Sequence, residues 1–85
     1  MKTCPWESID DFRDLIEFER FEKWMNGQIV AGQAVEVSVT VPYLGEYAGF
    51  REKQFCHIGS KTLWRLVWPD GPFHGLFEKV ALQQN

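Results

Sequence analysis

The sequence contains few of the residues that build catalytic or metal centres. Its 85 residues include two cysteines and two histidines, and these show no paired metal-ligand spacing: Cys4, Cys56, His57 and His74. Cys56 and His57 are neighbours in a strand-like segment, where successive side chains point to opposite faces, so they do not form a thiol nucleophile with its base. No run of glycines follows a strand and opens a helix, as a phosphate-binding loop requires. We therefore expect no metal, no cofactor and no enzymatic activity.

The chain also lacks a basic excess and any long apolar run. Nine Lys and Arg residues stand against twelve Asp and Glu residues, a net charge of −3. A protein that binds nucleic acid without regard to sequence needs a basic stripe to neutralise phosphates, so we expect no nucleic-acid partner. No apolar stretch approaches the length of a membrane span, and the first eight residues, with Lys, Pro and Glu among them, do not resemble a signal peptide. These features predict a cytoplasmic protein with no membrane partner.

The length predicts a single domain, residues 1–85, that buries about 60% of the surface its unfolded chain exposes. The whole charge excess lies in residues 1–30, which hold seven acids and four bases, whereas residues 31–85 hold five of each. Such a half is either a solvated acidic face or a surface for a basic protein partner.

The first third of the chain predicts a helix from Ser8 to about Ala31. Ser8 is a suitable N-cap, and Gly32 is a natural stop after the last turn. The apolar residues recur every three positions, so their stripe drifts around the helix: Ile9, Phe12, Leu15, Phe18, Phe21 and Trp24. Three explanations are open: the helix breaks near residues 15–17, it is covered on both sides, or one side meets a partner.

The rest of the chain has the period of two that is typical of strands. Apolar and polar residues alternate over 35–41 before Pro42, and residues 52–58 and 62–68 flank a short turn, which predicts an antiparallel hairpin. Residues 76–80 read as a last strand. We therefore predict an α+β fold, with an N-terminal helix, continuous or kinked, packed on an antiparallel sheet of three or four strands.

The strand at 62–68 predicts the centre of the core. Trp64 and Leu66 share one of its faces, and we expect both to be buried. Arg65 points to the other face, where it either stacks on a tryptophan or pairs with an acid such as Glu78 on the next strand.

Two groups of residues are candidates for binding. The loop at 43–50 carries Tyr43, Tyr47 and Phe50 among glycines, and tyrosine is enriched at protein interfaces. The alternative is that Tyr43 and Phe50 fold back and close one end of the sheet. Asp10, Asp14 and Glu17 lie at helical i, i+4 and i+7 positions, and so share a face of the predicted helix. Because a short chain offers little room for a cleft, this face is solvated rather than catalytic.

Two stretches carry a resemblance to a known family. They are Phe18-Glu19-Arg20-Phe21, continuing through Trp24-Met25, Gln28-Ile29 and Gly32 to Val35-Glu36-Val37, and the block Leu63-Trp64-Arg65-Leu66-Val67-Trp68-Pro69-Asp70-Gly71-Pro72-Phe73. Over residues 12–80 the chain resembles small bacterial immunity proteins encoded beside polymorphic or contact-dependent toxins.

This resemblance implies a non-enzymatic cytosolic protein, monomeric or a small homo-oligomer, that binds and occludes a cognate toxin domain. The acids and loop aromatics would supply the partner-binding surface: Asp10, Asp11, Asp14, Glu17, Tyr43, Glu46 and Tyr47. The alternative function is a β-sheet module that binds a small molecule or peptide on its Trp/Phe face.

Overall fold

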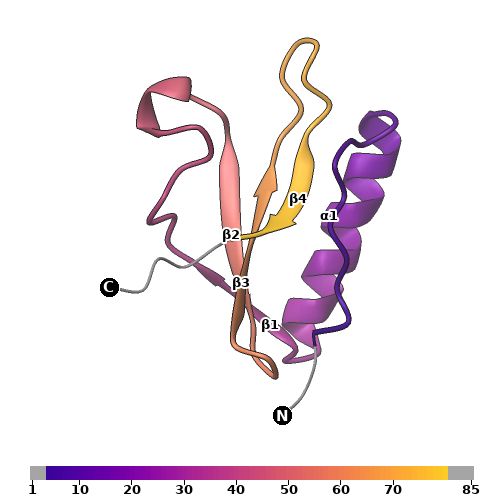
Figure 1. Ribbon diagram of the computed structural model, residues 1–85. Helices are drawn as coiled ribbons and strands as arrows, with labels where there is room; N and C mark the ends of the chain where they lie inside the picture. The colour runs from indigo at the N-terminus through magenta and orange to yellow at the C-terminus, as the bar shows by residue number, and fades with distance from the viewer. Residues whose placement is uncertain (1–3, 81–85) are drawn as a thin grey trace.

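A computed structural model describes residues 4–80, apart from the side chain of Glu46. Its elements in chain order are α1 (Leu15–Val30), β1 (Ala34–Val37), the short 3-10 helix η1 (Glu46–Ala48), β2 (Glu52–His57), β3 (Thr62–Val67) and β4 (Leu76–Lys79). The strands form one antiparallel sheet in the order β1-β2-β3-β4, and α1 lies against one of its faces (Figure 1). The predicted α+β fold and the predicted β2–β3 hairpin are confirmed. Within the described residues, no helix combines the length and the apolar character that crossing a membrane requires.

The helix begins later than its sequence pattern predicts. The N-cap is Asp14, whose Oδ1 accepts a 2.9 Å hydrogen bond from the backbone N–H of Glu17. The predicted start at Ser8 is wrong, because residues 8–14 are extended and irregular rather than helical. Ile9 instead exchanges two backbone hydrogen bonds with Phe77 of β4, of 2.7 and 2.8 Å, and this pairing requires extended backbone.

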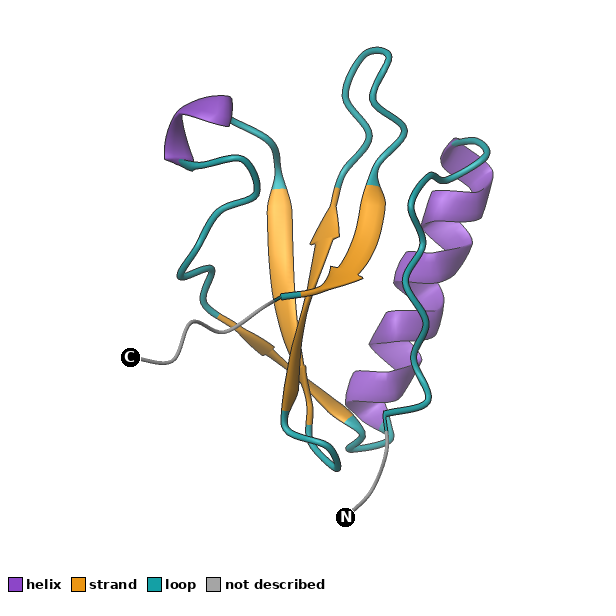
Figure 2. Cartoon of the chain, viewed as in Figure 1, coloured by secondary structure: helices purple, strands orange, loops and turns teal. Residues whose placement is uncertain are grey.

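This late start accounts for the drifting apolar stripe. Ile9 and Phe12 reach the core from an extended segment that runs along α1, whereas Phe18 and Met25 reach it from the helix itself (Figure 2). The two sets therefore do not share one helical period. The helix ends as predicted: Gly32 has φ +77°, and the hydrogen bond from Gln33 N to Gln28 O, at 2.9 Å, closes a Schellman motif.

The first strand is shorter than predicted. β1 ends at Val37, which pairs with Gln54 of β2, so the prediction of a strand through Val41 is wrong. Beyond Val37 the chain leaves the sheet, and the carbonyl of Val41 accepts a 3.2 Å hydrogen bond from the Gln54 side chain. At Val41 a hydrogen bond to a side chain of β2 thus takes the place of strand-to-strand backbone hydrogen bonds. The residues that follow form a loop.

The apolar core lies between α1 and the sheet. Trp64 is 5% exposed and Leu66 1%, which confirms both as core residues. The buried members of the core are Trp6, Phe12, Phe18, Met25, Ala34, Phe55, Trp64, Leu66 and Phe77. Trp6 contributes from the N-terminal segment and contacts Trp24, Trp64 and Phe77 at ring-centroid distances of 5.8, 5.8 and 5.9 Å. Sequence periodicity did not indicate Trp6, because this tryptophan belongs to no repeating pattern.

Candidate functional site

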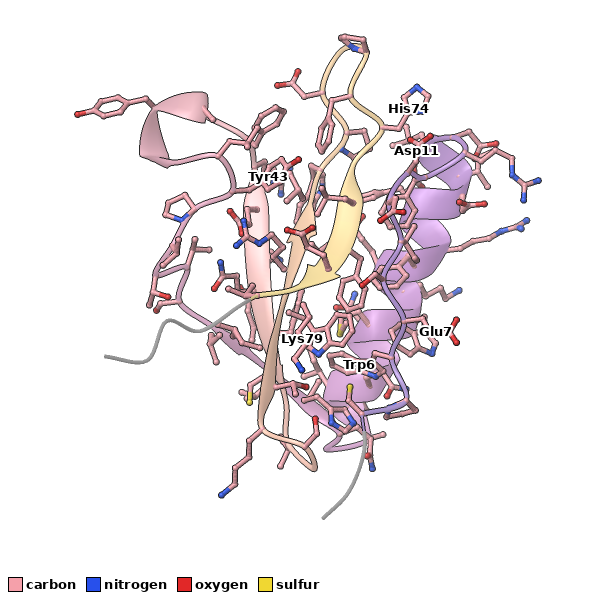
Figure 3. All side chains as sticks on the ribbon, viewed as in Figure 1. Trp6, Glu7, Asp11, Tyr43, His74 and Lys79 are labelled. Carbon is pink, nitrogen blue, oxygen red and sulfur yellow. The ribbon has the colours of Figure 1, made fainter. Side chains whose placement is uncertain are left out.

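Three segments meet at one end of the sheet, which we call the loop end: residues 10–15 before and at the start of α1, residues 42–51 around η1, and residues 69–75 between β3 and β4. All three lie at the same end of the molecule in Figure 1, opposite the β2–β3 turn. Figure 3 shows His74 and Asp11 together beside the start of α1, and Tyr43 on the side of the sheet away from the helix. The predicted binding residues are thus at one end, but in two groups separated by the β3–β4 loop.

An aromatic cluster anchors the 42–51 segment to the β3–β4 loop. Phe50 lies 4.8 Å from Phe73 and 5.7 Å from Tyr43, and Tyr43 stacks on Phe73 at 5.9 Å (ring centroids). All three side chains are half-buried. Tyr43 and Phe50 therefore fold back and close this end of the sheet, which is one of the two interpretations that the sequence allows. The Tyr43 ring packs inside the loop rather than standing on an open surface.

The outer side of the same segment is apolar and exposed. Tyr47 is 97% exposed and Leu44 72%. The side chain of Glu46, which the sequence also predicts to bind, lies outside the described residues. The loop therefore presents apolar side chains to solvent from a backbone that the aromatic cluster anchors.

The acids near the start of α1, on the other side of the β3–β4 loop, make different contacts. Asp14 caps α1, and the Glu17 carboxylate accepts a 3.0 Å hydrogen bond from the backbone N–H of Arg13 and lies 3.5 Å from Arg13 Nε. These contacts stabilise the helix start. Because Asp10 precedes the helix, the expectation that Asp10, Asp14 and Glu17 share one helical face is wrong.

Asp10 and Asp11 are exposed acids of the pre-helix segment at the loop end. Asp11 Oδ1 lies 2.9 Å from His74 Nδ1, and both side chains are more than half exposed. This contact ties the pre-helix segment to the β3–β4 loop. Between the same two segments is a hollow of about 140 Å³, lined on one side by Phe12 and on the other by Phe73.

A buried polar network lies on the sheet face away from α1. The Glu52 side chain is 4% exposed; its Oε1 accepts a 2.8 Å hydrogen bond from Tyr43 N, and its Oε2 accepts one of 2.9 Å from Gln54 Nε2. Arg65 Nε lies 3.7 Å from Glu52 Oε2 and 3.5 Å from Glu78 Oε2. Of the two roles that the sequence offers Arg65, pairing with Glu78 is therefore the one found.

Sequence analysis missed Glu52 and Gln54 as members of this network. The alternation of the strand 52–58 places both on the face that Arg65 occupies, and this register was the available signal. Two carboxylates share one guanidinium, so the network carries one excess negative charge.

A second hollow, of about 250 Å³, opens beside this network. We call it the Glu52 hollow; its walls are Val39, Pro42, Tyr43, Gly45, Gly49, Phe50 and Glu52. Both hollows at the loop end are smaller than the about 300–1,000 Å³ of drug-sized ligand sites. Each has room for a single side chain rather than a cofactor.

The histidine in the sheet belongs to the hairpin turn. His57 is 5% exposed, and its Nδ1 lies 2.8 Å from Ser60 Oγ, which lies 2.7 Å from Thr62 Oγ1. The indole N–H of Trp64 donates to the same Thr62 oxygen at 2.9 Å. This chain of hydrogen bonds closes the β2–β3 turn. Among residues 4–80, no three His, Cys, Asp or Glu side chains are grouped to hold a metal ion.

Comparisons of this chain with protein-family models, with curated proteins and with solved structures found no match.

Proposed function

We propose that this protein is a toxin-neutralising immunity protein whose loop end binds and occludes a cognate bacterial toxin domain. The observation that carries the proposal is that exposed apolar side chains stand on a loop that is held in place by aromatic packing. Tyr47 and Leu44 are 97% and 72% exposed, yet the loop that bears them is held by the Tyr43, Phe50 and Phe73 cluster. A pre-ordered loop loses little conformational entropy on binding, so its aromatic side chains serve as anchors.

The charge distribution supports a basic partner. The excess of three negative charges lies in residues 1–30. Asp10 and Asp11, both exposed, belong to the pre-helix segment at the loop end. This segment lies on the other side of the β3–β4 loop from η1, which carries Tyr47 (Figure 1). These two acids, which we call the acidic rim, attract a basic surface to the loop end and raise the association rate. The resemblance to immunity proteins points to the same kind of partner.

The alternative, a β-sheet module with a ligand on its Trp/Phe face, has less support. That face carries Trp64 and Leu66, which α1 and the N-terminal segment cover. A ligand there would have to displace the helix. The exposed apolar side chains of the loop end need no such rearrangement.

The direct test is co-expression with the toxin domain encoded in the adjacent gene. We expect wild-type protein to protect the cells, and the double substitution Leu44→Ala and Tyr47→Ala to abolish protection. The matched control is Ile58→Ala, which removes an apolar side chain that is 48% exposed at the opposite end of the sheet. Cell death in the presence of the wild-type protein would overturn the proposal, and protection by the double variant would exclude this surface.

The acidic rim has its own test. We expect Asp10→Lys to lower the association rate with the toxin domain and to weaken its salt dependence, while the dissociation rate changes little. Asp14 is unsuitable for this experiment, because its replacement also removes the helix cap, at a cost of about 1 kcal/mol. Glu36→Lys makes the same charge change on β1, and an equal loss of rate in that control would show that only net charge matters.

A further inference from the structure

We infer that the Glu52 hollow receives a cationic side chain, an arginine or a lysine, from the protein partner. The inference rests on the proposed function, since it names a contact within the proposed binding surface. It is carried by three observations: the nature of the walls, the uncompensated charge beneath them, and the size and openness of the space.

The walls combine aromatic rings with a carboxylate. Tyr43 and Phe50 are in edge contact, 5.7 Å between centroids, and Glu52 completes the hollow with them. One guanidinium already lies over the Tyr43 ring, with Arg65 Cζ 5.5 Å from its centroid, and Phe50 supplies the second ring of the hollow. The faces of aromatic rings attract ammonium and guanidinium groups, and a carboxylate adds a charge-assisted hydrogen bond. Glu52 Oε1 accepts one hydrogen bond, from Tyr43 N, and a carboxylate oxygen has a second lone pair for another donor.

The negative charge at Glu52 is only partly neutralised within the protein. Arg65 Nε is shared between Glu52 and Glu78, at 3.7 and 3.5 Å. The two other bases next to Glu52 in sequence are engaged on the other face: Arg51 and Lys53 lie 4.8 and 5.8 Å from the Trp68 ring. The Glu52 side chain is 4% exposed, so water screens its charge weakly, and the electrostatic attraction to a second cation is stronger here than at the surface.

The hollow is about the size of one side chain, and it is open on the side where its two glycines lie. Its volume of about 250 Å³ is too small for a drug-sized ligand. Gly45 and Gly49 line it with φ of +88° and +74°, and a Cβ built on either would meet no atom within 4 Å. The positive φ explains why glycine stands at both positions, and the missing side chains leave the entrance clear.

The test is a titration of the 85-residue chain with small probes, monitored by the NMR chemical shifts of its backbone amides. The first probe is N-acetyl-arginine amide, and the second is N-acetyl-citrulline amide, which has nearly the same shape and no charge. We expect the arginine probe to shift the amides of Gly45 and Gly49, and to bind at least about fivefold more tightly than the citrulline probe. Equal binding of the two probes, or no shift with either, would overturn the inference.

Two tryptophan substitutions supply the matched variants. Val39→Trp places a large ring at the wall of the hollow, whereas Val41→Trp makes the same change two residues along the loop, outside that wall. We expect the first to weaken the arginine probe about fivefold or more, and the second to leave it unchanged. Unweakened binding to a folded Val39→Trp variant contradicts the inference; if that variant fails to fold, the comparison of the two probes on the wild type decides.

The outcome is separable from that of the proposed function. Protection from the toxin without selective binding of the arginine probe would refute the cationic contact and leave the immunity proposal standing. Selective binding of the arginine probe without protection from the toxin would support the cationic contact and refute the immunity proposal.

Discussion

The replacement of Arg65 by methionine tests the buried polar network directly. Arg65 is 8% exposed and lies between two carboxylates; the side chain of Glu52 is 4% exposed and that of Glu78 is 42% exposed. Methionine fills much of the same volume but leaves the Glu52 charge without its partner. Removal of one member of a buried ion pair costs about 3–5 kcal/mol. A domain of this length has a total stability of about 4–13 kcal/mol, so the variant should lose a large part of its stability.

The measurement is urea denaturation followed by tryptophan fluorescence, with the shift in midpoint converted to free energy. Lys53→Met is the matched control, because Lys53 and Glu36 are 3.9 Å apart with side chains 43% and 51% exposed. Such a surface pair contributes about 0–1 kcal/mol. We expect the Arg65 variant to lose at least about 2 kcal/mol more than this control.

A second substitution identifies the cause of the loss. Glu52→Gln in the Arg65→Met background removes the uncompensated charge, and we expect it to restore about 1–3 kcal/mol. If Arg65→Met costs no more than Lys53→Met, the network is not a buried ion pair. If Glu52→Gln lowers the stability further, desolvation of the Glu52 carboxylate is not the reason for the loss.

Two further predictions concern the β3–β4 loop and the core. Gly75→Ala should cost about 1–3 kcal/mol more than Gly71→Ala, since both have positive φ but only the Cβ at Gly75 would meet a backbone atom, Val67 O at 2.8 Å. Equal losses in urea denaturation would show that the loop absorbs this contact. Trp64→Ala should cost about 3–5 kcal/mol and Trp24→Ala, 41% exposed, clearly less; a melting temperature that Trp64→Ala leaves unchanged would contradict the assigned core.

The elements with strong local signals were predictable from the sequence. Gly32 marked the helix end because a positive φ after the last turn favours glycine. Trp64 and Leu66 were identifiable as core residues because the alternation of a strand places these two large apolar side chains on the same face. The short turn between residues 58 and 62 required an antiparallel hairpin, and the sheet has it.

The sequence could not predict features that depend on distant partners. Ser8 has a good local capping signal, yet Asp14 caps the helix, because Ile9 pairs with Phe77 some seventy residues away and holds the preceding chain extended. A tertiary hydrogen-bonded pairing thus outweighed a local preference.

The same reasoning applies to the candidate site. The sequence by itself determined the class of fold, the glycine-rich aromatic loop and the acidic first third of the chain. The folded chain decided which of those residues remain exposed and unengaged: Tyr43 packs in the anchoring cluster, Asp14 caps α1, and Tyr47 is 97% exposed. It also assembled the Glu52 hollow from two sides of a loop. The physical reason is that burial and charge compensation are properties of neighbours in space, and only the packed chain settles which neighbours each side chain has.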